Sequence, residues 1–340
     1  MTKMEELLKQ QQEIAAAIAA EFKRGVEEAA KGMAEAQYSL AVMYHHGQGV
    51  AKNFAEAMRC YKLAAEQGNA AAQFNLGLMY EKGQGVNEDY AQAVNWYKLA
   101  AGHGYSSAHL SLGALYELGK GVKQDYQEAM RWYKLASDNG SANAKYAIGS
   151  MYENHHGVEQ DFASAMAWYK LAAALGHTNS HIQLGFLYEK GLGARQDYAE
   201  AMRWYKAVAV SGSDAGRLHV GSLYENGLGV KEDYHEAMRW YKLAADHGSP
   251  DAQNRMGFLY SNGKGVKQDY HEAMRWYQLA AAQEHAGALA NLGFMHEHGQ
   301  GVEENEARAL SYYARAAKKG DQNAVRNRDM LEARLAAHKG

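Results

Sequence analysis

The sequence predicts an all-α protein, a right-handed α/α superhelical solenoid of eight 36-residue helix-turn-helix repeats. Three observations support this prediction: a pattern that recurs every 36 residues, apolar residues at three- and four-residue spacing inside each copy, and a Gly-x-Gly turn between the two helical segments. Self-similarity at such a period is the signature of stacked repeats. The eight copies begin at Gly32, Gly68, Gly104, Gly140, Gly176, Gly212, Gly248 and Glu284.

The composition favours helices arranged in one continuous array. Of the 340 residues, 47% are hydrophobic and 22% are charged, which is typical of a folded globular protein. Only one proline occurs and no Ser/Gly/Pro-rich linker separates the copies, so one continuous architecture explains the length better than two or three ordinary domains. The net charge of -3 gives no general attraction to nucleic acid, which we do not expect as a partner.

The cysteine content and the hydropathy pattern bear on location. The single cysteine, Cys60, cannot form a disulfide within the chain. No stretch approaches the roughly 18 apolar residues of a membrane-spanning helix, and no signal peptide is visible. We therefore expect a cytoplasmic protein without membrane insertion, unless a leader was removed before residue 1.

The first helix of each copy has one apolar face and a glycine beside it. In the second copy the face comprises Ala72, Leu76, Met79 and Tyr80, and the glycine is Gly77. A glycine inside a helix costs about 1 kcal/mol relative to alanine, so its recurrence implies close backbone approach by the partner helix. The equivalent glycines are Gly113, Gly149, Gly185, Gly221, Gly257 and Gly293.

A glycine turn and a capping residue separate the two helices. Gly83 and Gly85 end the first helix, because glycine tolerates positive φ. Asp89 occupies the N-cap position of the second helix and Gln92 follows three residues later, a capping box whose cap contributes about 1 kcal/mol. Each copy is therefore one helical hairpin, which must stack on its neighbours to bury both apolar faces. The box recurs as Asp125/Glu128, Asp197/Glu200, Asp233/Glu236 and Asp269/Glu272.

The consensus A-x3-L-G-x2-Y-x2-G-x-G-V-x2-D-Y-x2-A-x2-W-Y-x2-A resembles the Sel1-like repeat, a relative of the tetratricopeptide repeat, over residues 32–319. The resemblance implies an α/α superhelix. It also implies an adaptor or scaffold role, as in bacterial members and in eukaryotic protein-quality-control complexes. Some bacterial members carry a disulfide in each repeat, and that pattern is absent from this sequence.

The two ends of the chain depart from the repeat. Residues 1–31 are predicted to form an N-terminal capping helix and residues 320–340 a C-terminal one, since the outer faces of a stack need covering. The alternative for the N-terminal helix is dimerisation, which would give a homodimer. Its apolar stripe contains Leu7, Ile14, Ile18 and Phe22, and the C-terminal helix carries Val325, Leu331 and Leu335.

The first helix of each hairpin lines a concave groove if the tetratricopeptide geometry carries over. In each copy, one such residue stands two positions before the recurring leucine and another stands one position after the recurring glycine. These residues would then face a peptide or protein partner, and most of them are apolar. The alternative is that these residues are buried between adjacent first helices. The groove candidates are Tyr38, Phe74, Leu78, Leu110, Tyr146, Ile182, Phe186, Leu218, Asn254 and Phe258, with Ser222 and Phe294 at the same offsets.

A glutamate recurs near the end of the first helix. Inside a groove the fields of these carboxylates would partly add and favour a basic or amine-bearing partner segment. The alternative is that each glutamate accepts backbone N–H hydrogen bonds from a neighbouring turn. The members are Glu81, Glu117, Glu153, Glu189, Glu225 and Glu297, with His45 and Ser261 as exceptions.

Histidines and the outer face of the second helix offer weaker signals. His177 and His181 have the spacing that can chelate a metal, but no third ligand is apparent, so we expect neither a metal nor a cofactor. His155 replaces the first turn glycine of the fourth copy, so that turn is strained or rebuilt. Arginines recur on the second helix, where acidic residues of the first turn offset them.

No catalytic triad, phosphate-binding glycine loop or pair of catalytic acids stands out in the sequence. We therefore expect a non-catalytic scaffold or adaptor that binds a peptide or protein domain in the groove. The first alternative is a dedicated inhibitor or immunity-type protein that wraps one enzyme or toxin. A hydrolase-like enzyme is a minor alternative.

Overall fold

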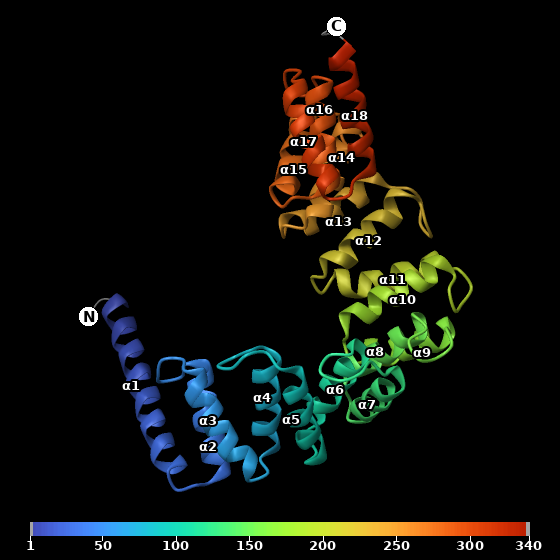
Figure 1. Cartoon of the computed structure of the whole chain (residues 1–340). Helices are drawn as coiled ribbons and strands as arrows, with labels where there is room; N and C mark the ends of the chain where they lie inside the picture. The colour runs from blue at the N-terminus through green and yellow to red at the C-terminus, as the bar shows by residue number, and fades with distance from the viewer. Residues whose placement is uncertain (1–2, 338–340) are drawn as a thin grey trace. The chain divides into compact units, whose positions relative to one another are not determined.

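The computed structural model describes residues 3–337, which form eighteen α-helices and no strand (Figure 1). The predicted all-α class is therefore confirmed. The predicted terminal helices extend to residues 1–2 and 338–340, which lie outside the described residues. The chain divides into two compact units between Gly176 and His177, at a boundary between two hairpins.

The first unit contains α1 (Lys3–Ala29) and four hairpins, in which consecutive helices pack against each other. We number the hairpins 1 to 8 along the chain. Hairpins 1 to 4 are α2 (Ala34–His46) with α3 (Phe54–Glu66), α4 (Ala70–Glu81) with α5 (Tyr90–Gly102), α6 (Ser106–Leu118) with α7 (Tyr126–Asp138), and α8 (Ala142–Glu153) with α9 (Phe162–Ala173).

The second unit repeats this arrangement and ends with α18 (Gln322–Ala337). Hairpins 5 to 8 are α10 (Thr178–Lys190) with α11 (Tyr198–Ala209), α12 (Asp214–Glu225) with α13 (Tyr234–Asp246), α14 (Pro250–Asn262) with α15 (Tyr270–Ala282), and α16 (Ala286–Glu297) with α17 (Glu306–Lys318).

The glycine of each first helix makes room for a tyrosine ring of the second helix. A Cβ atom on Gly77 would lie 2.4 Å from Cε1 of Tyr97, and the same clash recurs at Gly221 with Tyr241. The prediction of a packing glycine is confirmed, but its partner was wrong: a buried aromatic ring, and not the backbone of the second helix, occupies the space.

The N-caps form as predicted, but the second half of the capping box does not. The Asp125 carboxylate accepts the Glu128 N–H at 3.0 Å, as an N-cap should. The Asp125 N–H, which a capping box would leave to the Glu128 side chain, instead donates to the Tyr116 carbonyl at 3.0 Å. The Glu128 carboxylate is therefore free to pair with Arg131 at 3.0 Å.

The turn of hairpin 4 keeps its shape without the usual glycine. His155 adopts φ 61°, the left-handed conformation that glycine occupies in the other turns. Its Nδ1 atom accepts the Gln160 N–H at 3.1 Å, which offsets part of the strain. Of the two predicted alternatives, a strained turn and a rebuilt turn, the structure has the strained one.

The two terminal helices contact their neighbours differently. In α1 only the C-terminal half packs against hairpin 1, where the Phe22 ring meets Tyr44 edge-on at 5.4 Å. Leu7 and Ile14 of the predicted stripe are exposed, at 51% and 54%. In α18, by contrast, Leu331 is fully buried in the core of hairpin 8 and Leu335 packs beside it.

Candidate functional site

The recurring glutamates bind tyrosine hydroxyls of their own hairpins. The Tyr97 hydroxyl donates to Glu81 at 2.5 Å, across the two helices of hairpin 2. The alternative prediction of backbone N–H partners was therefore wrong, since a hydroxyl group of the second helix occupies that role. The remaining pairs are Tyr133–Glu117 (2.6 Å), Tyr169–Glu153 (2.5 Å), Tyr205–Glu189 (3.1 Å), Tyr241–Glu225 (2.6 Å) and Tyr313–Glu297 (2.8 Å).

This hydrogen bond locks a buried ring and a partly shielded carboxylate together. Burial raises the pKa of Tyr241, and the hydrogen bond to Glu225 raises it further. Only 9% of the Glu225 side chain is exposed, and Arg255 of the next hairpin lies 3.9 Å from its other oxygen. The main role of the glutamate is thus to stabilise the hairpin that carries it. In hairpin 6 its charge is partly offset by Arg255.

The apolar groove candidates are half-buried, which places them between the two predicted alternatives. The Phe74 ring, for example, lies 5.3 Å from the Tyr97 ring and 4.8 Å from the Tyr105 ring of the next hairpin. Leu218 and Phe258 pack in the same way against the core between α13 and α14. Each candidate therefore contributes one side to packing and keeps the other at the surface.

The structure places four candidates of the second unit, Leu218, Asn254, Phe258 and Phe294, around two hollows on the first-helix face. The first, of about 450 Å³, contains the candidates Leu218 and Asn254. Asp251 and Arg255 give this hollow a charged lining. Its full lining is Leu218, His219, Ser222, Tyr241, Asp251, Asn254, Arg255 and His285. Burial lowers the pKa of His219, with Lys190 lowering it further and Glu189 opposing them.

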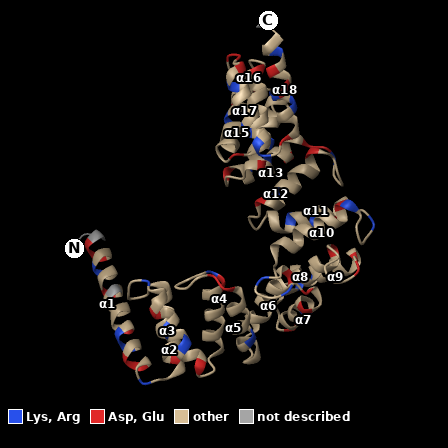
Figure 2. Ribbon diagram, viewed as in Figure 1, with Lys and Arg blue, Asp and Glu red and all other residues tan. Residues whose placement is uncertain are grey.

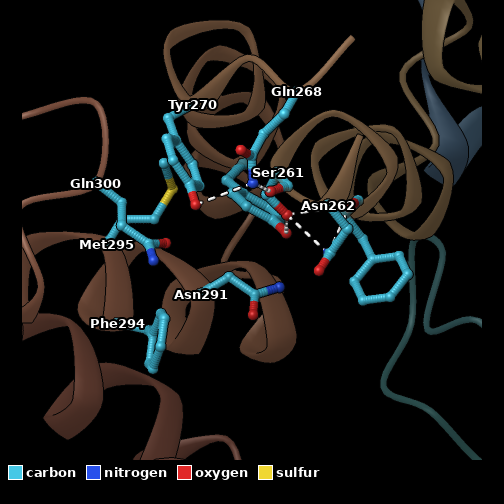
Figure 3. Close-up of a pocket in the computed structure, with 10 residues that line it drawn as sticks. Ser261, Asn262, Gln268, Tyr270, Asn291, Phe294, Met295 and Gln300 are labelled. Atoms are coloured by element: carbon cyan, nitrogen blue, oxygen red, sulfur yellow. Dashed lines mark hydrogen bonds between the residues drawn. The ribbon is translucent and has the colours of Figure 1, made fainter. Parts of the chain in front are cut away.

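The second hollow, of about 470 Å³, lies between hairpins 7 and 8 (Figure 3). We call it the hairpin 7 pocket. It opens at Ser261, the position where the glutamate pattern is interrupted. The Tyr277 hydroxyl, which would meet a glutamate in other hairpins, lies 3.4 Å from the Ser261 hydroxyl. The lining residues are Phe258, Ser261, Asn262, Gln268, Tyr270, Tyr277, Asn291, Phe294, Met295 and Gln300.

The candidates outside these hollows serve other contacts. The Tyr38 and Tyr146 rings lie 5.9 Å and 5.4 Å from the buried tyrosines of their own hairpins. Phe186 lies under the Lys190 ammonium group, 5.7 Å from the ring centroid. Leu78, Leu110 and Ile182 pack against the cores that include the following hairpins.

A second exposed series was missed by the sequence analysis. In six of the eight hairpins, a leucine stands two residues after the buried tyrosine of the second helix and is exposed, between 38% and 50%. The signal was available, because these leucines recur at one offset of the repeat. We call them the leucine ladder: Leu63, Leu99, Leu135, Leu171, Leu243 and Leu279.

Charged residues of both signs are interspersed in each unit (Figure 2). The arginines of the second helices pair with glutamates one turn earlier, as Arg59 does with Glu56 at 3.0 Å. This pairing agrees with the expectation that acidic residues of the first turn offset these arginines. Between Lys3 and Ala337, no helix is both long and apolar enough to cross a membrane.

The paired histidines of hairpin 5 are used in local structure. His177 caps α10 by accepting the Ser180 N–H through Nδ1 at 3.2 Å, and the Nδ1 atom of His181 contacts the His177 carbonyl at 3.1 Å. Within the described part of the chain, no three His, Cys, Asp or Glu side chains are grouped as a metal would require.

An array of helical hairpins with hollows along one face defines a helical-repeat protein of the class that generally mediates protein interactions. The chain belongs to the Sel1 repeat family. The Sel1 repeat model matches it in eight segments: 34–69, 70–105, 106–141, 142–177, 178–209, 216–249, 250–285 and 286–321.

Solved structures agree with this assignment. The chain is similar to c5321 of uropathogenic Escherichia coli, a protective antigen with an SLR fold, at 35% identity and a TM-score of 0.77, over 92% of this chain and 68% of that one. It is also similar to a Sel1 repeat protein of Oxalobacter formigenes, at 31% identity and a TM-score of 0.71, over 91% and 89% of the two chains. Yeast Tom70 shares the fold at 12% identity and a TM-score of 0.51, over 83% and 60%. No curated protein matches the chain.

Proposed function

We propose that the protein is a non-catalytic scaffold that binds a peptide segment or protein domain along the first-helix face of its hairpins. The observation that carries this proposal is the pair of neighbouring hollows in the second unit, both lined by groove candidates. Each hollow combines aromatic or aliphatic surface with polar groups, as binding sites generally do. Membership of the Sel1 repeat family supports the proposal, because proteins of this family are generally interaction scaffolds.

Site-specific photocrosslinking in the native host tests the proposal. A benzoylphenylalanine at Phe294, which is 42% exposed on the first-helix face, should crosslink to a partner on irradiation. The matched control carries the same group at Leu279, which is 47% exposed on the leucine ladder. Crosslinks from position 279 but not from position 294 would contradict the proposal and assign binding to the ladder.

The identity of the crosslinked proteins separates an adaptor from an inhibitor. Several partners in moderate yield are expected for an adaptor, because promiscuous surfaces bind each partner less tightly. A single partner recovered in near-stoichiometric yield would favour the inhibitor or immunity-type alternative. Either result retains binding on the first-helix face.

We also propose that α1 mediates a homodimer. Its N-terminal half carries Leu7, Leu8 and Ile14, exposed at 51%, 52% and 54%, on a helix that packs against hairpin 1 only near its other end. Light scattering after size exclusion should give twice the chain mass, and Leu7→Lys with Ile14→Lys should give the monomer. A wild-type protein that is monomeric at high concentration would leave α1 a capping helix only.

A further inference from the structure

The hairpin 7 pocket exists because one side chain of the repeat is shortened. In hairpin 6 the Tyr241 hydroxyl donates to Glu225 at 2.6 Å, and in hairpin 8 the Tyr313 hydroxyl donates to Glu297 at 2.8 Å. In hairpin 7 Ser261 stands at this offset, and its hydroxyl donates to the Phe258 carbonyl at 3.0 Å. The volume of the missing carboxyl group therefore opens into the pocket beside Tyr277.

The lining of the pocket contains no charged side chain. Phe258, Phe294 and Met295 provide apolar surface, and methionine sulfur contacts aromatic rings favourably. Figure 3 shows Asn291 and Phe294 on one helix across the pocket from Ser261 and Asn262 on another. A buried cation or anion would have no counter-ion here, so the lining favours a neutral ligand with an aromatic body.

Several polar groups of the pocket keep unused hydrogen-bonding capacity. Asn291 donates through Nδ2 to Asn254 at 3.0 Å, which leaves its carbonyl oxygen as an acceptor. Asn262 likewise uses its NH2 group, toward the Phe258 carbonyl at 2.8 Å, and keeps its carbonyl oxygen. Gln268 also uses its NH2 group, toward the Ser261 carbonyl and the Tyr270 hydroxyl, and keeps its carbonyl oxygen. The three amide oxygens of Asn262, Gln268 and Asn291 thus remain as acceptors and fit a neutral O–H donor.

We propose that the hairpin 7 pocket binds the phenol side chain of a tyrosine in a partner peptide. This inference rests on the proposed scaffold function and names the side chain that the pocket selects. The ring packs against Phe258, Phe294 and Met295, and the hydroxyl donates to Asn291 or Asn262. The volume of about 470 Å³ lies within the usual range for ligand pockets and admits the ring with part of its flanking backbone.

Fluorescence polarisation with a matched set of peptides tests this proposal. The peptides are fluorescein-labelled nonamers of Ala and Ser that differ only in a central Tyr, Phe, Arg or Glu. We expect the Tyr peptide to bind about tenfold more tightly than the Phe peptide, which lacks the hydroxyl, and more tightly still than the two charged peptides. Equal binding of the Arg peptide would overturn the proposal, because it would show that the pocket does not select a neutral aromatic side chain.

Two variants at one position locate the binding. Ser261→Glu restores the side chain of the other hairpins and fills the pocket, so the Tyr peptide should bind at least about tenfold more weakly. Ser261→Ala keeps the space and should bind within about twofold of the wild type. Ser261→Glu should fold normally, since six other hairpins carry this glutamate, and circular dichroism checks this. Unchanged binding by Ser261→Glu would overturn the assignment.

A failure of the pocket assignment can be distinguished from a failure of the scaffold proposal. If no Tyr peptide binds the wild type while position 294 still crosslinks to a partner, the pocket assignment is overturned and the scaffold proposal stands. If position 294 gives no crosslink and no peptide binds, both proposals fail. Binding that survives in Ser261→Glu, together with crosslinks from position 279, would assign the peptide to the leucine ladder.

Discussion

Hairpins 6 and 7 have the same backbone packing but differ in what holds the buried tyrosine. A Cβ atom on Gly221 or on Gly257 would lie 2.6 Å from a ring atom of Tyr241 or Tyr277, so both rings press on their first helices alike. Tyr241 then binds a carboxylate at 2.6 Å, whereas Tyr277 has only a hydroxyl at 3.4 Å.

The pKa values of the two phenols reflect the same difference. In hairpin 6 burial raises the pKa of Tyr241, and the Glu225 carboxylate adds to that increase. In hairpin 7 burial raises the pKa of Tyr277 to about 12, and the Ser261 hydroxyl opposes the increase. A change at this one position of the repeat thus removes the hydrogen bond between the tyrosine and a carboxylate and leaves an open pocket, while the two helices still form.

The largest expected effect comes from filling the space of the packing glycine. Gly221→Val should destabilise the protein by about 3 kcal/mol, because Tyr241 is 1% exposed and its hydroxyl is held by Glu225 at 2.6 Å. Gly257→Val should cost less, since no carboxylate holds the Tyr277 hydroxyl and the ring can shift into the pocket that it borders. Thermal melts followed by circular dichroism measure both variants. Gly102→Ala is the control: nothing lies within 4 Å of the added methyl group, so a gain of about 1 kcal/mol is expected.

Equal losses in the two valine variants would show that the pocket gives Tyr277 no freedom. Hairpins 6 and 7 would then differ only in the hydrogen bonding of the buried tyrosine.

Removal of the tyrosine hydroxyl should affect hairpin 6 more than hairpin 7. Tyr241→Phe leaves a Glu225 oxygen without its donor, which should cost about 1 to 2 kcal/mol. Tyr277→Phe removes only a 3.4 Å contact and should cost less than about 0.5 kcal/mol. Amide hydrogen exchange in α12 and α13, compared with α14 and α15, reports the local loss. A larger loss in hairpin 7 would contradict the assigned roles of the two hydroxyl groups.

The sequence predicted the hairpins well because their determinants are local. Helical periodicity, the N-cap aspartate and the turn glycines act within a few residues, so Asp125 and its equivalents could be placed without a structure. The capping box failed because the competing acceptor, the Tyr116 carbonyl, belongs to the previous helix. Such a competitor is close only after the hairpin folds.

The site was less predictable because it depends on contacts across the hairpin. Nothing in the local pattern pairs Glu81 with Tyr97, sixteen residues away, although both recur at fixed offsets. The exception at Ser261 was visible in the sequence, but its consequence required the position of Tyr277. Asn291 and Gln300 reach the pocket from the next hairpin, and no periodic signal marks them.

Exchange of the residues at positions 225 and 261 should reverse the difference in stability between hairpins 6 and 7. Ser261→Glu supplies a carboxylate to Tyr277 and should stabilise hairpin 7 by about 1 kcal/mol. Glu225→Ser should destabilise hairpin 6 by a similar amount, because Tyr241 loses its acceptor. The melting temperature measures the change in overall stability, and amide hydrogen exchange measures the change in each of the two hairpins. A loss of stability in Ser261→Glu would mean that the backbone around position 261 no longer accepts the repeat side chain.

The smallest expected effect is a pH dependence that hairpin 6 has and hairpin 7 lacks. His219 of α12 stacks on the Tyr205 ring with centroids 4.3 Å apart, and the equivalent residue of α14 is Arg255. Burial lowers the pKa of His219, Lys190 lowers it further, and Glu189 opposes them. Below the ordinary value of 6.5 the unfolded chain takes up a proton that the folded chain resists, so stability falls as the pH falls from there toward the folded pKa.

We therefore expect the melting temperature to decrease between about pH 7.5 and 5.5, and His219→Gln to reduce that decrease, since an amide keeps a planar group without titrating. The control His235→Gln changes an exposed histidine of the same hairpin and should leave the decrease as it is. Hydrogen exchange at the two pH values should show a larger loss of amide protection in α12 than in α14. An equal response of α14, where Arg255 replaces the histidine, would assign the pH dependence to groups outside hairpin 6.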